Sequence, residues 1–368
     1  MDRWSLPGPA GFIGEVIDAL REGASVVVGA SSPACKALAL PLEDRIADEW
    51  RITGPIVPSG LEPLDEIYAA LNVDDDPSAR RSAASLIRRI ESKRVILITG
   101  VAMPDWPAWQ RLLDDYANAS RSVPAVDRSQ LLVITSGVPK GRLPNRAPAL
   151  IPLIWDGVVG EADVFSYVIQ SLRRSGGRVD AHAKLVARII TRLALWDFDL
   201  ADGLLGLDPR ELFDPTAAVQ AAASGVPALQ QLGTRWEDGG SAEFDGEALQ
   251  HAIALVRGGD PGSDLAMRLW AAQASELLPA LELCRRQLAK RMKDARLRLP
   301  VDLNGEMIHD LMDVEIGPLL HLARRHRLPP DIVRVAEKLW RLRNKLAHLV
   351  PLEADEALDP ELHSMRRR

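Results

Sequence analysis

The sequence predicts a three-layer α/β domain built on a parallel sheet, followed by an all-α linker and an all-α helical bundle. Short β-branched runs alternate with amphipathic segments over the first 155 residues, as they do in parallel sheets with helices on both faces. In the rest of the chain apolar residues recur every three or four positions, which is the spacing of packed helices. Glycine and proline cluster at the ends of these segments.

Breaks in the pattern divide the chain into four expected parts. Residues 1–155 form the α/β domain, residues 156–260 a helical linker or relay, residues 261–350 the helical bundle, and residues 351–368 a flexible tail. The clearest break is the stretch Arg-Gly-Gly-Asp-Pro-Gly at residues 257–262, whose composition favours a loop.

Composition excludes several classes of protein. With 47% hydrophobic and 26% charged residues, the 368-residue chain has the make-up of a soluble protein with two or three domains. Its apolar runs fall short of the roughly 18 residues that a membrane span requires, and its N-terminus lacks the order of a signal peptide. The two cysteines, Cys35 and Cys284, lie far apart in different expected domains, without the spacing of metal ligands, and they exclude a disulfide framework. We therefore expect a cytoplasmic protein that binds no membrane.

The first strand and helix carry a degraded phosphate-binding loop. A strand at residues 26–28 is followed by a helix over residues 36–50. A P-loop requires GxxxxGK[ST] between two such elements, whereas residues 30–37 read Ala-Ser-Ser-Pro-Ala-Cys-Lys-Ala. Alanine and cysteine replace both glycines, and Ala37 replaces the hydroxyl that would hold Mg²⁺. We expect Lys36 to lie at the surface and this domain to use no nucleotide cofactor.

The remaining elements of this half complete the alternation of strands and helices. The strand that would carry the acidic residues of an ATPase ends in Thr99 and Gly100 instead. This half resembles the P-loop core of AAA-like and STAND regulatory ATPases with both nucleotide motifs degraded, and an unrelated doubly wound domain would show the same alternation. The expected elements are helices over residues 11–21 and 77–92 and strands over residues 94–100, 131–135 and 150–154.

The expected linker contains one acidic pair that could be mistaken for a metal site, and two further aspartates that mark helix starts. Asp197 and Asp199 would diverge on a helix, so capping of the next helix is the better interpretation than a metal site. Asp208 and Asp214 each precede a proline, a pattern typical of helix starts. The helices expected before them run over residues 161–174 and 180–195.

The predicted bundle contains three helical stretches. The first is long and capped by Ser263, the second covers residues 304–326 with an interruption at residues 317–318, and the third begins at Pro330 and ends before Pro351. Three histidines in this region lack the spacing of metal ligands and the HExxH pattern, so we expect no metal site. They are His309, His321 and His326.

The last of these helices ends in the candidate catalytic residues Arg343, Asn344 and His348. A phosphate-binding cation, an amide and a titratable base within six residues suit RNA chemistry. Arg343 lies at the edge of the apolar stripe, and in an ideal helix it points roughly 140° away from His348. A snorkelling arginine and a solvated histidine at a helix end would give the same pattern.

This segment resembles the signature of the HEPN superfamily, in which an arginine, a polar residue and a histidine end a helix of an all-α bundle. Arg343, Asn344 and His348 match it residue by residue over roughly the last hundred residues of the chain. The resemblance implies a metal-independent endoribonuclease acting as a homodimer whose two motifs face each other, in bacterial conflict or antiviral defence with partner proteins. Other members are inert folds used for assembly, so a non-catalytic adaptor stays open.

Charge is distributed unevenly along the chain. The net charge is −6, yet residues 285–345 hold 15 Lys/Arg against 8 Asp/Glu. Such asymmetry predicts a polyanion-binding region, with a solvated helix face as the alternative. The candidate RNA contacts are Arg285, Arg286, Lys290, Arg291, Lys293 and Lys345. All but Lys345 belong to the densest run of basic residues, which also includes Arg296 and Arg298.

Overall fold

The computed structural model describes residues 2–72, 81–174, 176, 179–259, 262–295, 297, 299–303 and 305–365. The chain forms two units, each made of two segments. Unit 1 comprises Met1–Tyr167 and Val226–Gly258, and unit 2 comprises Val168–Gly225 and Gly259–Arg368. The expected linker at residues 156–260 is thus divided between the two units, whereas the break expected near residue 260 coincides with a unit boundary.

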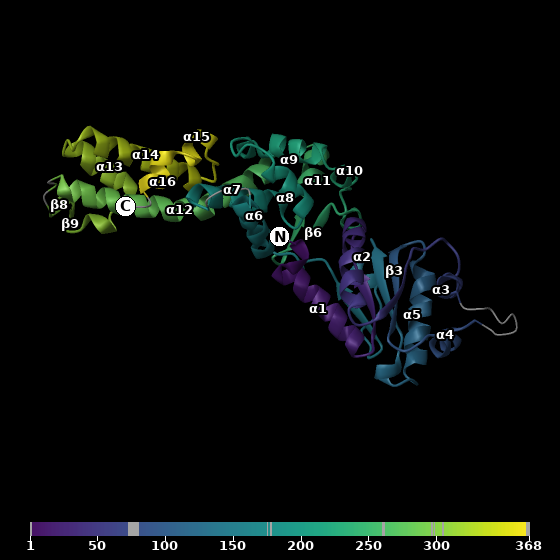
Figure 1. Ribbon diagram of the computed structural model, residues 1–368. Helices are drawn as coiled ribbons and strands as arrows, with labels where there is room; N and C mark the ends of the chain where they lie inside the picture. The colour runs from purple at the N-terminus through teal and green to yellow at the C-terminus, as the bar shows by residue number, and fades with distance from the viewer. Residues whose placement is uncertain are drawn as a thin grey trace. The chain divides into compact units, whose positions relative to one another are not determined.

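Unit 1 is built on a five-stranded parallel sheet in the order β2-β3-β4-β1-β5. Figure 1 shows strand β3 of this sheet between helices α2 and α5. Four strands lie where the sequence predicts them. The fifth, β2, escapes the sequence analysis because Gly54 and Pro55 interrupt its apolar pattern at the edge of the sheet. The strands are β1 Ser25–Gly29, β2 Arg51–Ile56, β3 Arg94–Ala102, β4 Gln130–Ser136 and β5 Leu150–Ile154.

Helices cover both faces of this sheet, which confirms the predicted α/β class. Val26 and Val28 of β1 pack with α1 and α2, whereas Val27 packs with the cluster that includes α3, α4 and α5. Of the helix expected over residues 77–92, Ala83–Arg89 forms α4, and residues 77–80 lie outside the described part of the chain. The other helices are α1 Pro7–Arg21, α2 Ser32–Ala47, α3 Pro63–Leu71 and α5 Trp106–Ser120.

The second segment of unit 1 differs from the all-helical linker that the sequence predicts. Two of its strands form an antiparallel hairpin joined by Asp245 and Gly246, both with positive φ. Asp156 ties this hairpin to the first segment by accepting the Glu243 N–H at 2.8 Å. The elements are α10 Pro227–Gln230, the 3₁₀ turn Trp236–Asp238, β6 Ser241–Phe244, β7 Glu247–Gln250 and α11 Ala252–Gly258.

Unit 2 is mainly helical in its described residues, in agreement with a helical C-terminal region. Its longest helix, α12, packs against α7 and α14. Asp197 and Asp214 cap α8 and α9 by accepting backbone N–H groups at 2.8 to 3.0 Å, as predicted. The helices are α7 Ala181–Ala194, α8 Phe198–Leu205, α9 Pro215–Ser224, α12 Gly262–Asp294, α13 Ile316–Arg325 and α14 Pro330–Ala347, with α6 Glu161–Arg174 crossing the unit boundary.

The stretch between α12 and α14 departs from the predicted helix over residues 304–326. It contains the hairpin of β8 Val301–Leu303 and β9 Glu306–Ile308, then the 3₁₀ turn Leu311–Asp313 and α13. Gly317 and Pro318 lie in the first turn of α13 rather than at an interruption. Proline fits there because the first turn needs no intrahelical N–H donor. Asn304 lies outside the described residues.

The C-terminal segment also departs from its expected flexibility up to residue 365. It forms the short helices α15 Ala354–Ala357 and α16 Pro360–Met365. Gln273 of α12 exchanges two hydrogen bonds with the backbone of Leu352, at 2.7 and 2.9 Å. Leu352 and Leu362 are buried, so apolar contacts hold this segment on the bundle. Residues 366–368 lie outside the described part.

Candidate functional site

Helix α14 carries the candidate catalytic residues at its C-terminal end. Its apolar positions face the bundle, because residues at three- and four-residue spacing share one face of a helix. His348 is the C-cap, and its backbone N–H donates to the Asn344 carbonyl at 3.0 Å. The expected catalytic histidine therefore lies at the end of the helix, as the sequence predicts. The buried residues of α14 are Ile332, Val335, Ala336, Leu339, Leu342 and Leu346.

The three candidate catalytic side chains all lie outside this buried face. Arg343 is 45% exposed, and its Nη2 lies 3.6 Å from Glu315 Oε2. Asn344 is half-buried and His348 is exposed.

Arg343 opens onto a pocket of about 350 Å³ between α12, α13 and α14. Glu282, Asp313 and Glu315 make one wall of this pocket acidic. Of the three candidate catalytic residues, Arg343 is the one among the described residues that line this pocket. His348 is the C-cap of α14 and lies on another side of the helix. At 100° per residue the two side chains leave α14 about 140° apart. One chain thus presents its guanidinium and its imidazole to different surfaces.

Arg285, a candidate RNA contact, is buried rather than solvent-facing. It is 9% exposed and donates from Nη1 to the Val314 carbonyl at 2.6 Å and from Nη2 to the Met312 carbonyl at 2.8 Å. Its Nε and Nη2 also bond Glu282, and this hydrogen bonding raises the pKa of Arg285 despite burial. The side chain therefore links the segment that comprises the 3₁₀ turn Leu311–Asp313 and Val314 to α12 by hydrogen bonds.

The other candidate RNA contacts on α12 are exposed, but acidic side chains engage two of them. Arg286 shares Glu282 with Arg285, and Arg291 pairs with Asp331 in the first turn of α14. Lys290 and Lys293 are exposed. Arg296 and Arg298 lie outside the described residues.

Lys345, the last candidate RNA contact, belongs to a basic stripe that the sequence analysis missed. Its Nζ lies 2.8 and 2.9 Å from the two carboxylate oxygens of Glu356. The spacing of four, three and four residues puts the stripe on one side of α14 and was available as a signal in the sequence. The basic stripe consists of Arg334, Lys338, Arg341 and Lys345.

The residues that correspond to the end of a phosphate-binding loop lie in the first turns of α2 and pack against other parts of unit 1. Pro33 packs against Gly239, where an added Cβ would lie 2.8 Å from the proline Cγ. Cys35 is buried, with its Sγ 3.7 Å from the Ile134 carbonyl, and burial raises the pKa of its thiol. Lys36 is exposed, as predicted. Protein atoms therefore occupy part of the space beside the N-terminus of α2.

The described residues offer neither a metal-binding group nor a helix suited to crossing a membrane. Among the described residues, no group of three or more His, Cys, Asp or Glu side chains could hold a metal ion. His309, His321 and His326 are exposed, as expected of solvated histidines. None of the described helices combines the length and apolar character that crossing a membrane requires.

Comparison with known proteins identified no family. No family model matches the chain, and no curated protein does. A structural match is a chain of the Drosophila ORC structure bound to DNA, with a TM-score of 0.32 and 15% sequence identity over 90% of this chain and 85% of that chain. A likeness at this TM-score carries no argument about fold or function.

Proposed function

We propose that this protein is a HEPN-type, metal-independent endoribonuclease whose catalytic residues are Arg343, Asn344 and His348. The observation that carries the proposal is their common position at the end of α14, outside its buried face. Arg343 and His348 are exposed without a part in the apolar core, so their side chains are available to a ligand. Residues of these types at a solvent-facing helix end suit phosphodiester chemistry.

The reaction is an attack of a ribose 2′-hydroxyl on the adjacent phosphorus. The 2′-oxygen forms a bond to phosphorus, the bond to the 5′-oxygen breaks, and the products carry a cyclic phosphate and a 5′-hydroxyl. His348 takes the 2′-hydroxyl proton as a base or delivers one to the leaving oxygen as an acid, since an ordinary imidazole titrates near neutral pH. Arg343 stabilises the negative charge that grows on the phosphorane, and Asn344 orients the reacting groups.

A homodimer supplies the missing geometry. Arg343 and His348 of one chain diverge by about 140° around α14, so a single chain does not aim both at one phosphate. In a symmetric dimer, Arg343 of one protomer would meet His348 of the partner subunit. The two-fold axis would then create two equivalent sites, each with the arginine of one protomer and the histidine of the other.

In this proposal unit 1 regulates the ribonuclease and does not hydrolyse nucleotides, as in a degenerate STAND-like domain. Support comes from the exposed Lys36 and from the contact of Pro33 with Gly239 beside the helix terminus where phosphates would bind. A place in bacterial conflict or antiviral defence, together with defence partners, is part of the same proposal.

A second candidate function is a non-catalytic adaptor that docks through the same end of the bundle. Exposed apolar side chains near the candidate catalytic residues favour it: Trp340 is 44% exposed, and Leu349 and Val350 follow His348 in exposed positions. Such side chains often mark protein interfaces.

Cleavage of total RNA by the purified protein separates the two functions. Wild-type protein should release fragments with cyclic phosphate ends, and His348→Ala and Arg343→Ala should each lower the rate at least 100-fold, as expected for loss of an acid–base or charge-stabilising group. Glu337→Ala, on the same exposed side of α14, serves as the matched control. Activity that persists in both variants would remove the catalytic assignment, and an inactive wild type that dimerises would favour the adaptor.

A further inference from the structure

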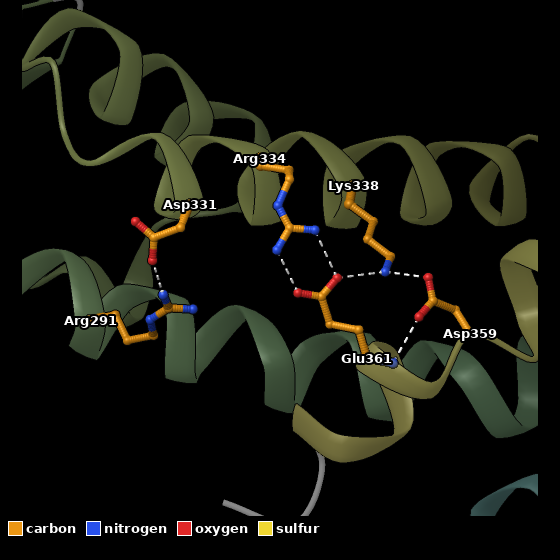
Figure 2. Close-up of polar contacts among 6 residues, drawn as sticks. All are labelled: Arg291, Asp331, Arg334, Lys338, Asp359 and Glu361. Carbon is orange, nitrogen blue, oxygen red and sulfur yellow. Dashed lines mark hydrogen bonds and ion pairs between the residues drawn. The ribbon is translucent and has the colours of Figure 1, made fainter.

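Acidic residues of the C-terminal segment cover the basic stripe of α14. Figure 2 shows Arg334 and Lys338 projecting from α14 toward α16. Arg334 meets both carboxylate oxygens of Glu361, at 2.9 and 3.1 Å, in the paired geometry that a guanidinium also uses for phosphate. Lys338 lies 2.9 Å from Glu361 and also pairs with Asp359. Two cations of the stripe are thus held by one short acidic turn.

The same arrangement continues toward the candidate catalytic residues. Glu356 accepts both hydrogen bonds from Lys345 and lies 3.6 Å from the Arg341 Nε. Lys345 directly follows Asn344, so the covered surface reaches the candidate site. From Arg334 to Lys345 the stripe spans twelve residues, or about 16 Å at the rise of an α-helix.

The carboxylates are held as anions by these contacts. Hydrogen bonds from Arg334 and Lys338 lower the pKa of Glu361. Burial works toward a higher pKa in Glu356 and Asp359, yet the hydrogen bonds from Lys345 and Lys338, together with backbone hydrogen bonds and the attraction of nearby cations, outweigh it and lower the pKa of both. Three fixed negative charges therefore face four positive ones along the helix.

Apolar anchors and acidic contacts have separate roles in this segment. Leu352, Leu358 and Leu362 are buried against the bundle and position the segment. The acidic side chains keep partial exposure, with Glu361 at 33% and Asp359 at 25%. Arg291 of α12 is paired with Asp331 next to the stripe, so the acid-covered basic surface extends onto α12 (Figure 2).

We propose that the basic stripe of α14 is an RNA-backbone-binding surface and that Glu356, Asp359 and Glu361 act as a built-in competitor for it. The carboxylates occupy the positions that phosphates would take, and RNA binds by displacing them from the four cations. The proposal rests on the proposed function for its choice of RNA and deepens it by assigning the binding surface and its regulation. RNA would then follow α14 toward His348, which lies on the side of the stripe, whereas Arg343 of the same chain leaves the helix on the opposite side.

The test neutralises the competitor and leaves its anchors in place. The variant is Glu356→Gln/Asp359→Asn/Glu361→Gln, made in a His348→Ala background so that bound RNA is not cleaved. Asparagine at residue 359 keeps the oxygen that accepts the Glu361 N–H, and glutamine at residue 356 keeps an oxygen for the Glu353 N–H. Thermal unfolding checks that the variant folds.

Binding of a 20-nucleotide uridine oligomer is measured by fluorescence anisotropy at several salt concentrations. The neutralised variant should bind at least ten-fold more tightly than its parent. Its plot of log affinity against log salt should steepen by up to about 3, because each phosphate contact of a single strand contributes about 0.7. Adding Arg334→Gln and Arg341→Gln should return the affinity toward that of the parent.

A charge-matched control distinguishes the stripe from the overall charge of the protein. Asp44→Asn/Asp114→Asn/Glu247→Gln makes the same change in net charge at exposed positions of unit 1. Equal affinity in the parent and the neutralised variant, or an equal gain in this control, would overturn the proposal. Tighter binding by the neutralised variant, with no cleavage by the protein that keeps His348, would support the surface and reject the ribonuclease.

Discussion

Replacing Arg285 by alanine should destabilise unit 2 without acting through RNA. The guanidinium donates to the buried Val314 and Met312 carbonyls, at 2.6 and 2.8 Å. A hydrogen bond with a charged partner contributes about 1.5–3 kcal/mol, so two lost bonds, partly replaced by water, should cost about 3 kcal/mol. For a unit of this size that loss corresponds to a drop of roughly 6–12 °C in Tm.

The adjacent Arg286 provides a matched control for this prediction. It shares Glu282 with Arg285 but is 59% exposed. Arg286→Ala should therefore change the free energy of unfolding by less than about 0.5 kcal/mol, as is usual for exposed ion pairs. Urea unfolding followed by circular dichroism measures both variants. Equal, small effects would refute the structural role of Arg285, and a loss of RNA affinity at unchanged stability would restore its predicted role as an RNA contact.

Three further predictions follow from the packing and the charges. Leu362→Ala should cost about 3 kcal/mol in urea unfolding, since it removes a fully buried side chain, whereas a mobile C-terminal segment would show no loss. Arg334 and Lys338 lower the pKa of Glu361 from 4.5, so its ion pairs stabilise the fold above pH 4.5, and this stabilisation is lost as the pH falls through the lower folded-state pKa. The difference in the free energy of unfolding between wild type and Glu361→Gln should shrink over the same range of pH. A difference that stays constant would contradict the prediction. Titration calorimetry with ATP and Mg²⁺ should show no binding heat in the wild type that is lost in Lys36→Ala.

The α/β half of the fold could be predicted because buried parallel strands leave a strong local signal. Val26, Val27 and Val28 form a continuous apolar run, as a strand with both faces covered must. The hairpin of β6 and β7 was missed although its two-residue turn is Asp245-Gly246, a typical hairpin sequence. Its flanking strands have only four residues each and mixed polarity, so their periodicity is weak.

The candidate site could be located but not assembled from the sequence. The end of α14 and its exposed polar residues follow from apolar spacing and from Pro351, both visible along the chain. The burial of Arg285 could not be predicted, because its carbonyl partners lie nearly thirty residues away in an irregular turn. The acidic cover of the basic stripe is likewise a tertiary contact, made by a segment whose polar composition favours disorder.

Mixing two inactive variants tests the central claim, a ribonuclease site shared by two copies of the chain. Arg343→Ala and His348→Ala are each expected to be inactive, but a mixed dimer would pair the intact arginine of one protomer with the intact histidine of the other. With random exchange, about half of the dimers are mixed and each has one complete site of two, so cleavage should recover to about a quarter of the wild-type rate. An active wild type combined with an inactive mixture, after subunit exchange is verified, would contradict the claim.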